Sequence, residues 1–323
     1  MTEMPNYPEV LQWAVPLFVA AILAELLWIV IKHRGGRYET RDALTSLILG
    51  AGSVAEGIVL GFVTWGFLMA LWAITPLDLG HSIWAILLFF LLDDLRYYWV
   101  HRFGHRIRWV WASHVNHHSS QHYNLTTALR QTWTGTFTMM MIVRAPLILL
   151  GFHPALVLFV GGLNLIYQFW IHTEAIGKMP RWFEAVMNTP SHHRVHHGRN
   201  ARYLDANYAG VFIIWDKMFG TFVPELDSEK PDYGLVQNIG TFNPIRAVFH
   251  EWVSLFRDVS QPGLSPRQRL GYAFGPPGYS HDGSRDTSLG IKAKHLARNP
   301  QDRGTPGFSD ELPPASDRLH AQP

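Results

Sequence analysis

Histidines are concentrated in three short motifs, and neutral imidazole is the commonest metal-binding side chain in proteins. An HxxxH pair lies at 101–105, an HxxHH set at 114–118 and a second HxxHH set at 193–197. The spacing of the first pair places both rings on one face of a helix. The sequence contains no cysteine, so thiolate ligands and disulfides are excluded and any metal must be held by nitrogen and oxygen. Such ligands suit iron, zinc, copper or nickel.

The histidines outnumber the ligands that one metal ion needs, since an ion in such a site takes about four or five. We therefore predict two metal ions with nitrogen ligands. The nine candidate ligands are His101, His105, His114, His117, His118, His172, His193, His196 and His197. Nitrogen-only coordination disfavours iron–sulfur clusters and structural zinc, and HxxxH lacks the glutamate of the HExxH metalloprotease motif. A redox-active dimetal centre that activates oxygen fits this pattern best.

The composition indicates that these histidines are positioned by helices in a membrane. Only 16% of the residues are charged, compared with about 25% in a typical soluble domain. Residues 11–31, 44–74 and 83–100 form long apolar stretches suited to crossing a bilayer. Residues 133–150 and 154–171 are also apolar, and they either span as a pair or form a re-entrant hairpin. The predicted fold is an all-α integral membrane bundle of about four to five transmembrane helices with a cytosolic, histidine-rich dimetal cap.

Basic residues predict the orientation of this bundle. Lys32, Arg34, Arg37 and Arg41 follow the first apolar stretch, and basic residues mark the cytoplasmic side. The far end of the second stretch, residues 75–80, has no Lys or Arg. These features predict a multi-pass protein whose histidine motifs all face the cytoplasm. The N-terminus lacks the basic region of a cleaved signal peptide. The net charge of +2 gives no reason to expect a nucleic-acid partner.

The chain divides into a membrane domain over 1–260 and a tail over 261–323. Within the membrane domain, residues 101–131 and 172–225 form the predicted histidine cap. Residues 244–259 have the pattern of an amphipathic helix that lies on the membrane or covers the site. The tail is rich in Gly, Pro, Ser and charge beyond about Pro276, so we expect it to be largely disordered. Within the membrane domain, Arg144 is a charged residue in the otherwise apolar stretch 133–150. Charged residues inside a membrane usually face a cavity or a partner.

Asp94 lies seven residues before His101 on the same predicted helix face. Its carboxylate could accept the outer N–H of a ligating imidazole and so fix the orientation of that ring. It could equally pair with Arg96 or another cation at the membrane interface. Both readings remain open at this point.

Taken together, the motifs resemble the fatty acid hydroxylase/sterol desaturase superfamily, and most closely its alkylglycerol monooxygenase-like branch. The similarity covers about residues 40–225 and rests on five segments: DLRYYWVHR, HHSSQHYNLTTALRQ, YQFWIHTE, NTPSHHRVHHGRN and IWDKMFGTF. The resemblance implies four core spanning helices, a cytosolic cap that holds two iron ions at the nine histidines, and O₂-dependent oxidation of a lipid C–H bond. The predicted reaction is hydroxylation or desaturation of a lipid or sterol-like substrate from the bilayer.

Electrons would come from a separate donor protein or a pterin, because no cytochrome b5-like segment is evident. Arg106 and Gln121 stand where that branch carries glutamate. The departure at Arg106 argues against a pterin and against ether cleavage. Gln168 stands where relatives have a further histidine, and it either faces the metals or orients a ligand. Further residues that support the site or contact substrate are Asp94, Gln168, His192, Asn124, Arg130 and Glu174. For Asp205, Asn207 and Asp216, in a turn-rich segment, we expect a structural role.

Three other functions compete with this interpretation. A membrane-embedded metal-dependent lipid hydrolase would use a metal-bound water and need neither O₂ nor a reductant. A metal transporter or sensor would place its ligands along a path within the spans, not at helix ends. A helical scaffold without chemistry would make the histidine spacing accidental.

Overall fold

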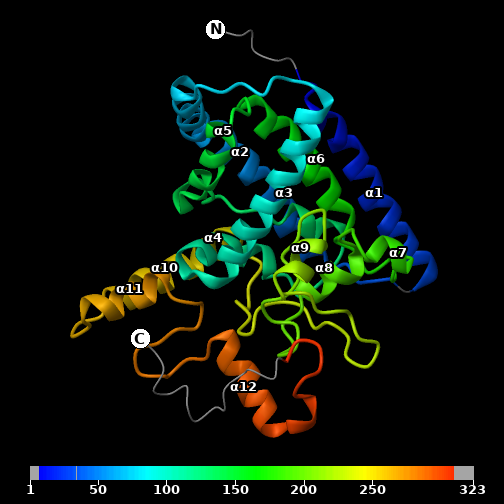
Figure 1. Ribbon diagram of the computed structural model, residues 1–323. Helices are drawn as coiled ribbons and strands as arrows, with labels where there is room; N and C mark the ends of the chain where they lie inside the picture. The colour runs from blue at the N-terminus through cyan, green and yellow to red at the C-terminus, as the bar shows by residue number, and fades with distance from the viewer. Residues whose placement is uncertain (1–6, 34, 309–323) are drawn as a thin grey trace.

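The computed structural model describes residues 7–33 and 35–308, and this part of the chain is helical with irregular connections (Figure 1). It contains no β-strand, only three isolated bridges. One end is built from α1 (Val10–Lys32), α2 (Thr40–Ile74), α3 (Ile83–Arg106), η2 (Thr136–Thr138), η3 (Met140–Arg144), α5 (Ala145–Leu149) and α6 (Ala155–Trp170). The other carries α4 (Arg108–His118), η1 (Leu125–Leu129), α7 (Arg181–Glu184), α8 (Pro190–His196), α9 (Ile214–Met218), α10 (Pro244–Val259), α11 (Pro266–Phe274), α12 (Ser288–Arg298) and η4 (Pro300–Asp302). The prediction of an all-α fold is confirmed for these residues.

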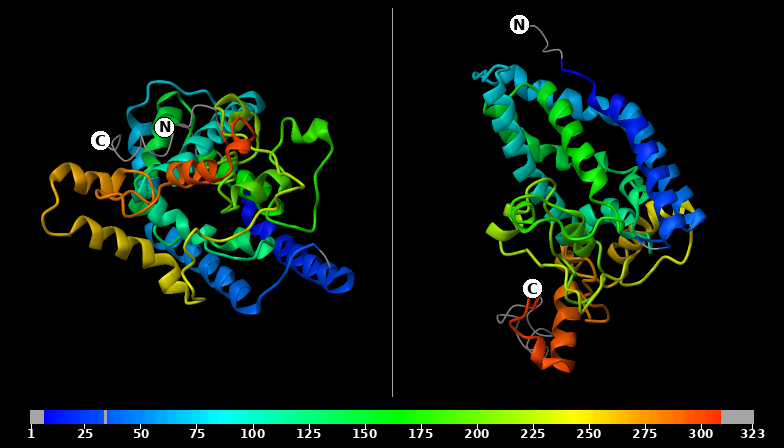
Figure 2. Two further views of the ribbon diagram at one scale, coloured as in Figure 1. Left: turned by 90° about the horizontal axis from the view of Figure 1, so that it is seen from below. Right: turned by 90° about the vertical axis from the view of Figure 1, so that its right-hand side faces the viewer.

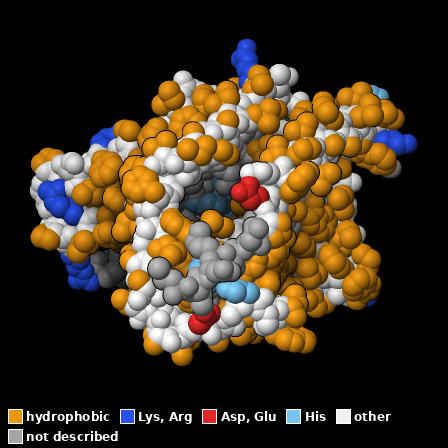
Figure 3. Space-filling view, turned by 90° about the horizontal axis from the view of Figure 1, so that it is seen from above, with side chains coloured by type: hydrophobic (Ala, Val, Ile, Leu, Met, Phe, Trp, Pro, Cys, Tyr) orange, Lys and Arg blue, Asp and Glu red, His pale blue; other side chains and the backbone are white. Residues whose placement is uncertain are grey.

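Helices α1 and α2 are long and apolar enough to cross a membrane. Only 11% and 6% of their most apolar windows are buried within the protein. Their side chains therefore stay exposed, which is stable only where lipid or another protein replaces water. The surface seen from the α2–α3 end is correspondingly dominated by hydrophobic side chains (Figure 3). Helix α3 has 24 residues but is less apolar, since it contains Asp93, Asp94 and Arg96, and α6 is shorter, with 16 residues.

The apolar stretch 133–150 differs from a single spanning helix. It consists of the short turns η2 and η3 followed by the five residues of α5. Helix α6 has 16 residues, which is about 24 Å of helix against a hydrocarbon core of roughly 30 Å. The turn between α5 and α6 contacts the α2–α3 connection, where the backbone N–H of Leu79 donates to the carbonyl of Gly151. A Cβ on Gly151 would lie 2.9 Å from Leu77, so this close approach requires glycine.

The two ends of α3 explain where the histidine cap forms. Ser82 caps the start of α3 by accepting a hydrogen bond from the backbone N–H of Ala85. The helix ends at Arg106, and Ile107 has an extended backbone (φ −120°). The chain then reverses so that α4 packs against α3. The histidine cap thus lies at one end of the bundle, as the views in Figure 2 show.

Helix α10 packs across α4 with Val248, Trp252 and Leu255 buried, as the amphipathic pattern predicted. Phe249, Val253 and Phe256 are exposed. The helix therefore covers the histidine cap through α4 and leaves a second apolar strip uncovered.

The expectation of a largely disordered tail does not hold for residues 261–308, where the structure describes α11 and α12. The guanidinium of Arg202 stacks on Phe308 and donates to the carbonyl of Pro306. The ammonium of Lys292 donates to the carbonyl of Gly307 at 3.0 Å. These contacts anchor a Gly- and Pro-rich segment on the cap, an effect that its composition does not reveal. Residues 309–323 lie outside the described part.

Candidate metal centre

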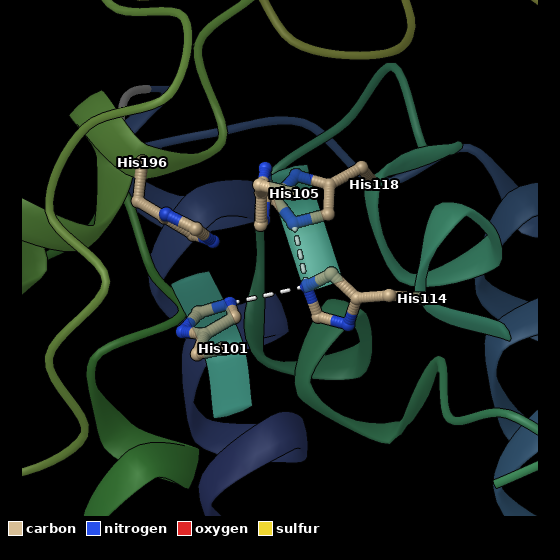
Figure 4. A group of neighbouring side chains, drawn as sticks. All are labelled: His101, His105, His114, His118 and His196. Carbon is tan, nitrogen blue, oxygen red and sulfur yellow. Dashed lines mark hydrogen bonds between the residues drawn. The ribbon is translucent and has the colours of Figure 1, made fainter. Parts of the chain in front are cut away.

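All nine predicted histidines meet in the histidine cap, in two adjoining groups. His101, His105, His114, His118 and His196 form the five-histidine group, and His117, His172, His193 and His197 form the four-histidine group. Within each group, one nitrogen from every ring lies within 4.8 Å of those of the others. In the five-histidine group the imidazoles converge on a common centre from α3, α4 and α8 (Figure 4).

Helix geometry explains how each HxxHH motif divides. His114 and His118 are four residues apart on α4 and belong to the five-histidine group, whereas His117 turns toward the other. The second motif divides in the opposite sense, because His193 and His197 join the four-histidine group and His196 the other. Residues at i and i+4 share a helix face, so each motif offers two imidazoles to one side and one to the other.

Backbone carbonyls orient four of the rings by accepting hydrogen bonds from Nδ1. The carbonyls of Tyr208 and Ala206 bind His101 and His196 at 2.8 and 2.9 Å. The carbonyls of Arg130 and Gln168 bind His117 and His172 in the same way. Those distances are 3.2 and 2.7 Å. Because a carbonyl oxygen only accepts, each Nδ1 carries the proton and each Nε2 of the neutral ring keeps its lone pair.

The inward nitrogens have the arrangement that a metal ion requires. Nε2 of His117 and Nε2 of His172 lie 3.3 Å apart, and both are left with lone pairs. Burial lowers the pKa of His117 well below its ordinary value and that of His172 to about 4, so neither ring supplies a proton at neutral pH. The Nε2 atoms of His105, His196 and His197 are buried and have no hydrogen-bond partner among the described residues. Two facing lone pairs repel unless a cation lies between them, and the residues present therefore fit a bound metal.

The expected roles of Asp94 do not match its contacts. Its carboxylate is buried and contacts neither an imidazole nor Arg96, which pairs with Asp93 instead. It accepts hydrogen bonds from the backbone N–H groups of Val211 and Phe212 and from the side chain of Trp215. A further bond comes from Asn164 on α6. Asp94 thus fastens the loop before α9 to α3 and α6, and acts on the site through the fold.

Gln168 and Arg130 orient ligands through their carbonyls, as described above. The side-chain amide of Gln168 donates to Asn164 and does not contact either histidine group. The guanidinium of Arg130 donates to Asp42 and Ser46 on α2 and to the carbonyl of Asn116 on α4. It therefore ties α4, which carries the first HxxHH motif, to α2 through one buried side chain.

The remaining candidates lie outside both groups. Asn124 caps η1 and donates to the carbonyl of Arg37. Glu174 accepts a hydrogen bond from Tyr233 at 3.1 Å. The ring of His192 lies 4.0 Å from the carboxylate of Glu184, and burial lowers its pKa to about 4. These three residues shape the cap and do not point into the histidine groups.

The turn-rich segment 205–216 contributes more than its sequence suggested. The carboxylate of Asp216 accepts hydrogen bonds from the backbone N–H groups of Tyr208 and Ala209, both at 2.8 Å. It thereby holds the loop whose carbonyls orient His101 and His196. Asn207, in a left-handed backbone conformation, donates to the carbonyls of His192 and Val223. The structural role predicted for these two residues agrees with their contacts.

Asp205 is the carboxylate that approaches a candidate ligand. Its Oδ1 lies 3.8 Å from Nδ1 of His105, and its Oδ2 lies 3.4 Å from the guanidinium of Arg106. We expected a purely structural role for this residue, because a turn-rich segment gives no sign of proximity to α3. The left-handed backbone of Asp205 (φ 57°) is the feature that aims it inward.

A cavity of about 380 Å³ adjoins the five-histidine group. His101 and His114 line one part of it, together with Tyr97 and Gly104. Its walls come from α2, α3, α4 and the turns η2 and η3. A substrate in this cavity would lie directly beside the histidines.

Comparison with known proteins relates the site to a family. Residues 86–221 match the Fatty acid hydroxylase family model. The chain is 43% identical over 245 residues to alkylglycerol monooxygenase from Danio rerio, covering 74% of this chain and 52% of that protein. It is 42% identical over 264 residues to the Homo sapiens enzyme of the same name, covering 79% and 56%. It is also 28% identical over 171 residues to cholesterol 25-hydroxylase from Homo sapiens, covering 46% and 58%.

The chain spans about half the length of the alkylglycerol monooxygenases it matches. No solved structure matches it. The matched segment 86–221 contains all nine histidines of the two groups. The candidate metal centre therefore lies within the segment that matches the Fatty acid hydroxylase family.

Proposed function

We propose that this protein is a membrane-bound, O₂-dependent lipid monooxygenase whose nine clustered histidines hold two iron ions. The observation that carries the proposal is the convergence of nine imidazoles, most of them buried, into two adjoining groups, with unprotonated nitrogens facing inward. Bound iron would supply O₂ activation and oxidation of a C–H bond. The family match and the similarity to alkylglycerol monooxygenases support this class of reaction.

The residues of the chain position the lipid and keep water from the reaction. The cavity beside His101 and His114 brings a substrate C–H bond next to the five-histidine group. Both histidine groups are enclosed by α3, α4, α8 and the loop at 205–216, so competing water is scarce there. We propose that the lipid tail reaches the cavity from the bilayer between α2 and α3, whose outer faces are apolar and exposed.

We further propose a multi-pass topology with the histidine cap in the cytoplasm, on the basis of the basic residues after α1. The reductant is external, and we favour a donor protein over a pterin. Arg106, which replaces a glutamate of the alkylglycerol monooxygenase-like branch, pairs with Asp205 beside His105. Arg106 places a positive charge beside the site where that branch has a negative one, and this difference distinguishes the chain from that branch.

Isotope labelling tests the proposal against the hydrolase alternative. The protein is purified anaerobically in lipid nanodiscs, loaded with Fe²⁺, and supplied with a lipid extract, a chemical reductant and ¹⁸O₂. We expect one ¹⁸O atom in a lipid product and close to two iron ions per chain. Oxygen incorporated from water, or turnover without O₂, would instead establish a hydrolase.

The double variant His117→Ala, His196→Ala removes one imidazole from each group. It should lose iron and product formation while retaining its helical circular dichroism. His250→Ala is the matched control, because this histidine on α10 belongs to neither group. Full product formation by the double variant would refute the proposal.

A further inference from the structure

The cavity beside His101 is charged, although it lies among apolar helices. Glu56, Arg96 and Arg144 all line it. Hydroxyl side chains from Thr64, Ser113 and Thr132 add further polar groups to its wall. A lipid tail needs none of these groups, and charged residues at such depth carry a large desolvation cost. The polar wall therefore requires its own explanation.

The charges in the cavity are unequally partnered. The guanidinium of Arg96 donates two hydrogen bonds to the carboxylate of Asp93, at 2.5 and 3.2 Å. The carboxylate of Glu56 accepts hydrogen bonds from the backbone N–H and the hydroxyl of Thr136, at 3.2 and 2.6 Å. Each of these groups is therefore satisfied within the protein.

Arg144 differs from both. Among residues 7–33 and 35–308 no carboxylate forms an ion pair with it, and its Nε atom is buried without a hydrogen-bond partner. Its position is fixed at the junction of η3 and α5, so it lies within an apolar segment. A cation in an apolar segment whose buried N–H has no acceptor is destabilised unless a ligand accepts that hydrogen bond.

We propose that Arg144, supported by Arg96, forms a subsite for the oxyanion of the lipid substrate, a carboxylate or a phosphate. This inference rests on the proposed function, since it assigns the substrate class of the same site. A guanidinium presents a planar fork of N–H donors that matches two oxygens of either anion. A neutral sterol or wax in the cavity would displace water from Arg144 without offering its guanidinium an anionic hydrogen-bond acceptor.

The subsite also restricts where the lipid is oxidised. Arg96 precedes His101 by five residues on α3, which corresponds to about 7.5 Å along the helix axis. An oxyanion held between Arg96 and Arg144 therefore places the first few carbons of the chain beside His101 and His114. The oxidised carbon lies near the acidic group, and the remainder of the tail extends away from the histidines.

Equilibrium binding without iron tests this subsite independently of oxidation. Radiolabelled palmitate is bound to the metal-free protein in nanodiscs and competed with unlabelled hexadecyl phosphate or methyl palmitate. We expect methyl palmitate to compete at least about tenfold more weakly than the better of the two anions, since it lacks the charge that pairs with Arg144. The arm with the stronger competitor identifies carboxylate or phosphate as the natural group.

Arg144→Gln should weaken palmitate binding by about tenfold or more and abolish the discrimination against methyl palmitate. Arg246→Gln, at an exposed arginine on α10, is the matched control and should bind as the parent protein does. If the glutamine variant does not fold, the discrimination by the parent protein decides alone. Equal binding of anionic and neutral lipids, or an unchanged affinity in a folded Arg144→Gln variant, overturns the subsite.

The binding assay also separates this inference from the proposed function. Anion-selective binding without any ¹⁸O product would retain the subsite and reject the monooxygenase. Oxidation of neutral lipids at equal rates by the parent protein and Arg144→Gln would retain the monooxygenase and reject the subsite.

Discussion

The imidazoles of His118 and His197 stack with their ring centroids 4.4 Å apart, although they belong to different histidine groups. One lies at the end of α4 and the other directly after α8. His193 and His196, one from each group, also stack, with ring centroids 5.0 Å apart. The two groups thus share a wall of imidazoles, and ions bound in them would lie close enough to act on one substrate.

Replacing either stacked histidine should therefore affect one ion more than the other. For His118→Ala we expect loss of iron from the five-histidine group, and for His197→Ala loss from the four-histidine group. Each variant should retain close to one iron per chain and lose at least about 100-fold in product formation, because ligand geometry governs metal affinity and reactivity. Metal analysis and Mössbauer spectra of the two variants measure this. Retention of both ions in either variant would contradict the assignment.

Asp216 is predicted to support the site from a distance, since it holds the loop that orients His101 and His196. Asp216→Asn replaces one accepting oxygen with a donor, so it cannot bind both N–H groups of Tyr208 and Ala209. We expect iron affinity to fall by about 10- to 100-fold, as for other groups that orient ligands. Competition with a chelator measures the affinity. Asp227→Asn, at an exposed cap position, should leave it unchanged, and equal affinities in the two variants would disprove the role.

Gly210 is predicted to be irreplaceable because Asp94 lies against it. A Cβ at this position would lie 2.8 Å from Oδ1 of Asp94 and 2.9 Å from the ring of Tyr97. Gly210→Ala should therefore reduce the free energy of unfolding by about 1–3 kcal/mol, the usual cost of overpacking. Reversible denaturation in detergent measures this. Gly161→Ala is the control, since a Cβ there meets no atom within 4 Å. Equal stability of the two variants would show that the loop around Gly210 shifts to accept the added methyl group without cost, which would contradict the prediction.

The anchoring of the tail should depend on pH through Lys292. Burial lowers the pKa of this ammonium from 10.5 to about 8. Between these values the unfolded segment binds a proton that the docked segment has released, so docking strengthens as the pH rises from about 8 to 10.5. Limited proteolysis of α12 at several pH values, compared with Lys292→Met at the same pH, measures the effect. A protection difference between the two proteins that does not change over this range would contradict it.

The sequence by itself determined which side chains are available to bind a metal. Imidazoles, their i and i+4 spacing and the absence of cysteine are local properties, so all nine histidines of the site could be found without coordinates. The apolar stretches likewise predicted helices, because hydropathy and length are read directly along the chain.

Only the tertiary structure decided which histidines meet. His196 joins His101 because the loop at 205–216 folds against α3, and that contact joins residues far apart in the sequence. The hydrogen-bond acceptors of the Nδ1 atoms could not be predicted either, because they are backbone carbonyls, which every residue carries. The contacts of Asp94 and Asp205, the order of the tail and the unpaired Arg144 depend in the same way on distant segments. Side-chain type sets what a residue can bind, whereas the packing of remote elements sets what it does bind.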